Sequence, residues 1–138
     1  MDAETIHAKM HAQLDQARLS GIAKACGWEF EVQELTAYVT LAPRRQRDRR
    51  FVLRLTFEEF PARAPSYMFV DRQTRQPTSE ASPSGVTHPE GGICTPGTRE
   101  FHERFHRNEA QHPWDAEKYT VLDTLHRIQQ LMEKGLGG

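Results

Sequence analysis

The sequence lacks the features that would place it in several large classes of protein. Its apolar stretches are all far shorter than a membrane span. The first ten residues, MDAETIHAKM, begin with acidic side chains and contain no apolar run, so they do not predict a secretory signal. The net charge is -1, so the chain carries no overall excess of positive charge that would indicate a nucleic-acid or membrane partner.

Cysteine is also scarce, because only Cys26 and Cys94 occur in the 138 residues. Two cysteines cannot form a disulfide framework, and free thiols are typical of proteins in the reducing cytoplasm. We therefore expect a cytoplasmic protein. The length and the absence of an internal repeat predict a single domain over residues 1–138.

The order of the predicted elements indicates an α+β fold. Apolar side chains recur at helical spacing over residues 4–20 and again over residues 116–134. The second of these helices has an apolar stripe formed by Tyr119, Leu122, Leu125, Ile128, Leu131 and Met132. Between the helices, strand-like patterns occupy residues 28–35, 36–43, 51–60 and 66–71. We expect an antiparallel β-meander of about four strands packed on an N-terminal and a C-terminal helix.

Two segments between these elements are strongly polar. Residues 71–87 are rich in Pro, Ser and Thr and predict a long exposed loop. The segment RRQRDRR, residues 44–50, places five arginines between two predicted strands. Its simplest interpretation is a solvated hairpin connection, and its alternative is a docking patch for an acidic partner.

The segment FHERFH contains the pattern H-E-x-x-H at His102, Glu103 and His106, with His112 six residues further on. On a helix this spacing puts two zinc ligands on one face beside a general base, so a zinc metalloprotease is one hypothesis. However, Glu109 occupies the position at which the extended protease pattern has Gly, and the surrounding residues are mostly charged. We therefore favour histidines of an enlarged loop that are exposed or line the active site, where they act in proton transfer or orient the acceptor, and we keep zinc binding as the alternative.

Three further segments carry a resemblance to a known family. The sequence FEEFPARAPSYMFVD (57–71) resembles the strand, proline turn and strand of ubiquitin-conjugating enzymes. HPEGGICT (88–95) resembles their active-site stretch, in which a His-Pro pair precedes the cysteine. HPWDAEKYTVLDTLHRIQQLM (112–132) resembles the segment in which a Trp leads into the following helix. The three segments stand in the family's order, after an N-terminal helix.

The resemblance implies an activity as well as a fold. Cys94 would be the catalytic cysteine, which receives a ubiquitin-like modifier from an activating enzyme as a thioester and passes it to an amine of a protein substrate. The ring of His88 would bond to backbone and hold the loop. By analogy, the N-terminal helix and the connections that include Arg44 to Arg50 would be the docking side for the activating enzyme. No cofactor is implied.

The sequence also departs from the family pattern. Glu90 stands where the family has the Asn of its His-Pro-Asn motif, and an ionised carboxylate cannot donate a hydrogen bond to an oxyanion. His102, His106 and Asn108 are the candidates to replace that donor. The segment between Cys94 and the Trp is longer than usual, and the family's last two helices have no counterpart. These departures fit a diverged member of bacterial type.

Two other hypotheses remain open beside the metalloprotease. The chain could be a noncatalytic relative that has the same fold, binds ubiquitin-like proteins and keeps its cysteine incidentally. Its last four residues, GLGG, also resemble the tail of a modifier, although the rest of the chain does not resemble that fold.

Overall fold

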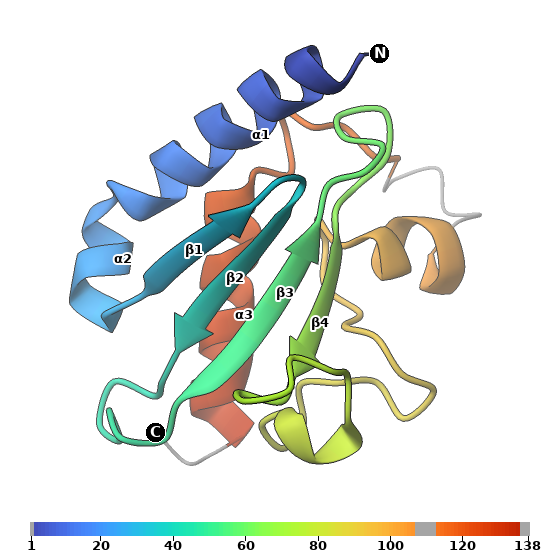
Figure 1. Ribbon diagram of the computed structural model, residues 1–138. Coiled ribbons are helices and arrows are strands. Elements are labelled where there is room, and N and C mark those ends of the chain that lie inside the picture. The colour runs from blue at the N-terminus through green and yellow to red at the C-terminus, as the bar shows by residue number, and fades with distance from the viewer. Residues whose placement is uncertain (1, 107–112, 136–138) are drawn as a thin grey trace.

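The computed structural model describes residues 2–106 and 113–135, and it contains one four-stranded sheet (Figure 1). The strands lie in the order β1-β2-β3-β4, and each pairs antiparallel with the next. Their bounds are β1 Glu29–Gln33, β2 Thr36–Leu41, β3 Phe51–Thr56 and β4 Ser66–Val70. With helix α1 (Ala3–Arg18) before the sheet and α3 (Val121–Gly135) after it, the predicted α+β meander is confirmed.

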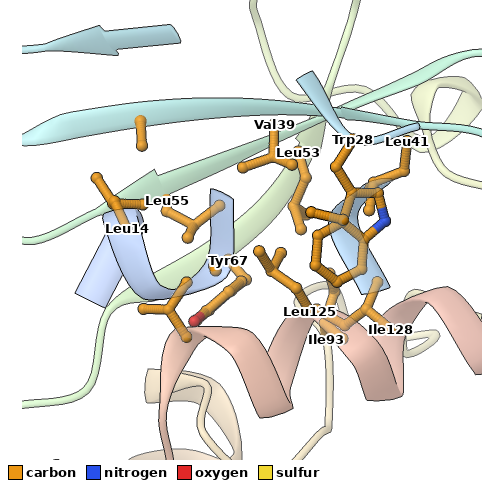
Figure 2. Packing of buried hydrophobic residues seen from close by; sticks show 14 of the residues in the cluster. Leu14, Trp28, Val39, Leu41, Leu53, Leu55, Tyr67, Ile93, Leu125 and Ile128 are labelled. Carbon is orange, nitrogen blue, oxygen red and sulfur yellow. The ribbon is translucent and has the colours of Figure 1, made fainter. Parts of the chain in front are cut away.

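One face of the sheet is buried against helices α1 and α3. Alternate residues of β2 are fully buried, and Val39 stands opposite Leu53 in the register of β2 with β3. Figure 2 shows Val39, Leu53 and Tyr67 pointing from the strands toward the two helices. Burial raises the pKa of the Tyr67 hydroxyl, so this ring stays neutral in the core. The buried side chains form one hydrophobic cluster that includes residues from both ends of the chain.

Capping side chains explain where the first helices begin and end. Asp2 Oδ1 accepts a hydrogen bond from Thr5 N at 2.8 Å, as an N-cap does. Ser20 Oγ accepts from Ala23 N at 3.1 Å and begins a second, unpredicted helix, α2 (Gly21–Cys26). Gly27 ends α2 in the left-handed conformation, at φ 72°. The predicted helix over 4–20 is thus correct for α1, but the chain returns to helix directly after it.

A buried polar network joins the helices to the sheet. Trp28 Nε1 donates to Gln129 Oε1 at 2.8 Å, and Gln129 Nε2 donates to Ala42 O at 2.9 Å. Both polar ends of the Gln129 amide are therefore paired, although this residue is only 1% exposed. The network holds α3 against the end of β2.

Several element bounds differ from the prediction. The third strand ends at Thr56 rather than at residue 60, and α3 begins at Val121 rather than at residue 116. Thr120 Oγ1 accepts from Asp123 N at 3.1 Å, which caps the helix there. Leu131 is 36% exposed, so it does not belong to the buried stripe of this helix.

The predicted loop over 71–87 contains a 3-10 turn (η1, Ser79–Ala81) and a bridge between Val70 and Pro77, and it buries Val86.

No helix in the described ranges is long and apolar enough to cross a membrane.

Candidate active site

Cys94 lies half-exposed in the loop that leads from β4 toward α3. A shallow depression of about 340 Å³ opens beside it, between this loop and the outer face of α3. The residues that line it are Cys94, Thr95, Pro96, Arg127, Gln130, Leu131 and Lys134. Cys94 is therefore half-buried at the edge of an open depression and is not part of the hydrophobic core cluster.

Helix α3 supplies one wall of this depression. Arg127, Gln130, Leu131 and Lys134 follow one another at the spacing of a single helical face, opposite the buried stripe. Two of the four are cations, and Arg127 Nη1 also donates to Pro96 O at 3.4 Å. Sequence reasoning did not single out these four residues. Their helical spacing was the available signal, but only the structure shows that the face lies beside Cys94.

Thr98 fixes the backbone on both sides of Cys94. Its hydroxyl lies 2.7 Å from Ile93 O and 3.0 Å from Thr95 O, and its Oγ1 accepts from Phe101 N at 3.1 Å. Because the side chain is fully buried, these bonds are shielded from water. The loop is thus held in one shape around the thiol.

Gly97 is packed between α3 and a buried histidine. Its φ is +105°, and a Cβ at this position would lie 1.9 Å from Thr124 Oγ1, so only glycine fits. On the other side, its backbone N–H donates to His102 Nε2 at 3.0 Å. Since that N–H can only donate, Nε2 is unprotonated and a neutral ring carries its proton on Nδ1. The His102 ring is 7% exposed and lies 4.6 Å from the Tyr119 ring, measured between centroids.

The His-Pro pair forms a second support for the loop. The ring of His88 accepts a hydrogen bond from Glu90 N at Nδ1, at 3.0 Å, so the predicted bond between this ring and backbone is confirmed. The backbone N–H of His88 donates to Gly92 O at 2.8 Å, which closes the turn. The side chain of Glu90 is exposed, while its carbonyl accepts from Arg104 Nη2 at 2.6 Å. Glu90 therefore contributes to the turn through its backbone.

The H-E-x-x-H residues stand on a single π-helical turn, η2 (Phe101–Phe105), or directly after it. Glu103 is paired with Arg63, whose Nε donates to Glu103 Oε2 at 2.9 Å. These hydrogen bonds hold the pKa of Glu103 below its ordinary value of 4.5. The His106 ring stacks on the Phe101 ring at 4.2 Å between centroids.

The described histidines of the prediction lie outside the lining of the depression beside Cys94. None of His88, His102 and His106 lines the depression at Cys94. Within residues 2–106 and 113–135, no three His, Cys, Asp or Glu side chains are grouped as metal ligands. Asn108 and His112 lie outside the described residues.

Cys26, the other cysteine, is buried and belongs to the hydrophobic core cluster. Its side chain is 6% exposed at the end of α2, and burial raises the pKa of its thiol. The two cysteines thus differ in their environment, and only Cys94 is presented at a surface.

Neither comparison with known proteins identifies the chain. No model of a protein family matches it, and no curated protein sequence matches it.

Proposed function

We propose that this protein is a ubiquitin-conjugating-type transferase in which Cys94 carries a ubiquitin-like modifier as a thioester. The observation that supports the proposal best is the position of the half-buried Cys94 in the lining of the depression between its loop and α3. A modifier delivered by its extended C-terminal tail needs such an open approach to the sulfur. The order of the three family-like segments along the chain is the second support.

The proposed chemistry consists of two exchanges at one carbonyl carbon. The Cys94 thiolate attacks the thioester that joins the modifier to its activating enzyme, a C–S bond forms, and the thiolate of the activating enzyme leaves. An amine of a protein acceptor then attacks the same carbon, a C–N bond forms, and the Cys94 thiolate leaves. The amine gives up its proton to a base. The ATP spent by the activating enzyme supplies the activated carbonyl.

The residues around the thiol suit a reaction that develops negative charge. Arg127 and Lys134 line the same depression as Cys94, and positive charge near a developing oxyanion favours the transition state. Glu90 cannot supply a donor there, since its side chain is exposed and its backbone serves the His88 turn. We propose that the cations of α3, together with the predicted candidates His102, His106 and Asn108, are the groups to test for this role.

The proposal implies three partners in the cytoplasm: the activating enzyme, the modifier and a protein acceptor. It implies no nucleic-acid or membrane partner. The chain would work without a cofactor or metal of its own. Zinc bound in stoichiometric amount and lost in His102→Ala would instead support the metalloprotease hypothesis, although His102 Nε2 and the Glu103 carboxylate are both engaged with other residues.

The decisive experiment incubates the protein with ATP and with a candidate activating enzyme and ubiquitin-like modifier from the same organism. We expect an adduct on a non-reducing gel that reductant removes and that Cys94→Ala abolishes. Cys94→Ser should give an adduct that resists reductant, because an oxygen ester replaces the thioester. Cys26→Ala is the matched control and should retain the wild-type adduct. If no adduct forms with these partners, the noncatalytic binding module becomes the better interpretation.

A further inference from the structure

The connection between β2 and β3 concentrates positive charge on the surface. Within it, five of the seven residues 44–50 are exposed arginines, here called the arginine patch: Arg44, Arg45, Arg47, Arg49 and Arg50. The whole chain carries a net charge of -1, so this patch is a local excess and not part of a general basic surface. Such an excess produces a field that attracts acidic partners.

The connection is ordered by hydrogen bonds within its own backbone. Gln46 N donates to Pro43 O at 3.0 Å, and Arg49 N donates to Gln46 O at 2.9 Å, which makes two consecutive turns. The guanidinium of Arg47 reaches across to α2, where Nη2 donates to Ala25 O at 2.7 Å. That guanidinium also covers Gly27, since a Cβ there would lie 2.6 Å from Arg47 Nη1.

Helix α3 anchors the same connection from another side. Glu133 Oε1 accepts from Arg44 N at 2.9 Å, and Gln129 holds the Ala42 carbonyl just before the patch. These contacts with two helices exceed what a solvated hairpin connection needs. They hold the backbone of the connection and the Arg47 side chain in place, which lowers the backbone entropy lost when a partner binds.

Few guanidiniums of the patch form ion pairs within the described part of the chain. In the described ranges, the guanidiniums of the patch form one ion pair, between Arg50 and Glu29 at 3.8 Å. Both side chains of this pair are about half exposed or more. A pair of this kind contributes little. A hollow of about 530 Å³ lies between Arg44, Arg45, Arg47 and Glu133 and leaves room for an incoming side chain.

We infer that the arginine patch is a docking surface for an acidic segment of a protein partner. The planar guanidinium of arginine can donate two parallel hydrogen bonds to a carboxylate, and the patch presents five exposed arginines on one ordered connection. A nucleic acid fits less well, because Asp48 and Glu133 interrupt the positive surface and residues 44–50 include no aromatic side chain for base stacking. The inference uses no group of the Cys94 loop, so it stands apart from the proposed function.

The patch and the candidate active site share one element. Glu133 lines the hollow among the arginines, and the next residue, Lys134, lines the depression at Cys94. A partner docked on the patch would therefore cover the last turns of α3, beside the thiol.

Fluorescence anisotropy of two labelled probes on the intact protein tests the inference. The first probe is a peptide of alternating glutamate and serine, and the second is single-stranded oligothymidylate of equal charge. The test variant is Arg45→Glu/Arg49→Glu, because the Arg45 side chain makes no bond with the described residues and that of Arg49 bonds only to Gln46. The matched control is Lys9→Glu/Lys118→Glu, which changes the net charge equally at two exposed positions elsewhere. Circular dichroism confirms that each variant is folded.

We expect the peptide to bind the wild type and the control, and the arginine variant to lose about tenfold or more in affinity. Raising the salt to about 0.15 M should weaken the binding without abolishing it. Equal loss in the control, or no binding of the peptide at all, would overturn the inference. Tighter binding of the oligothymidylate through the same arginines would also overturn it, in favour of a nucleic-acid surface.

Discussion

The backbone N–H of Gly97 donates to Nε2 of His102 across 3.0 Å, inside the protein. The first histidine of the H-E-x-x-H pattern thus supports the loop that carries Cys94. To bind zinc, His102 would have to use the same Nε2 lone pair that accepts this hydrogen bond, or turn its other ring nitrogen toward a metal shared with the other ligands. The contact explains why a histidine, whose unprotonated nitrogen accepts a hydrogen bond, stands at a buried position.

Replacing His102 by Phe should destabilise the protein by about 1–3 kcal/mol, because the Gly97 N–H then loses its acceptor in a buried place. His102→Asn should lose less if its carbonyl reaches the same N–H. Urea unfolding measures the stability, and hydrogen exchange at the Gly97 amide reports the bond itself. His11→Phe, on the exposed side of α1, is the control and should leave Gly97 exchange unchanged.

Alanine variants of Gly97 and Gly91, two glycines near Cys94, distinguish the cost of a steric conflict from the cost of backbone strain. Gly97→Ala combines a φ of +105° with a Cβ placed 1.9 Å from Thr124 Oγ1, so we expect a cost of more than about 3 kcal/mol and loss of any thioester adduct. Gly91→Ala has a φ of +87° but open space around the new methyl, and should cost only about 1–2 kcal/mol. Equal unfolding midpoints for the two variants would contradict the described contact with α3.

Alkylation should distinguish the two cysteines. Cys94 is half-exposed, whereas Cys26 is 6% exposed and burial raises the pKa of its thiol, so Cys26 has little thiolate at neutral pH. We expect iodoacetamide to modify Cys94 at least about tenfold faster than Cys26, which reacts only through local opening. Peptide mapping by mass spectrometry measures both rates. Comparable rates in the folded protein would contradict the placement of Cys94 at an open surface.

The pair formed by Arg63 and Glu103 predicts a dependence of stability on pH. Hydrogen bonds from Arg63 lower the pKa of Glu103 from 4.5, so the ionised carboxylate stabilises the folded state above that pH. This contribution is lost as the pH falls through the lowered folded value. Glu103→Gln should therefore be slightly less stable than wild type at pH 7, with the difference vanishing in strong acid. Acid unfolding curves of the two proteins measure the difference, and Glu117→Gln, which removes one carboxylate at an exposed position, is the matched control.

Much of the fold could be predicted because its signals are local. Helical spacing of apolar residues located α1 and most of α3, and alternation located the four strands. The misplaced bounds depend on single hydrogen bonds, such as the cap from Ser20 that begins α2 and the cap from Thr120 that begins α3. Leu131 was assigned to the buried stripe because spacing alone does not show how wide the covered face of a helix is.

The candidate site was only partly predictable, for a related reason. Cys94 and His88 could be singled out from their local sequence. The partners of this loop are distant in the chain: Thr124 and Arg127 lie on α3, and Arg63 holds the η2 turn from the proline segment. No local pattern shows that these residues meet.

By itself the sequence determined the class of fold and the presence of a cysteine in a loop rich in glycine and proline. Only the tertiary structure decided which thiol is exposed, that His102 faces Gly97, and that one helix borders both the arginine patch and the depression at Cys94. Local patterns follow from the spacing of neighbours along one element. Contacts between elements depend instead on how the sheet and helices pack, which the whole chain decides together.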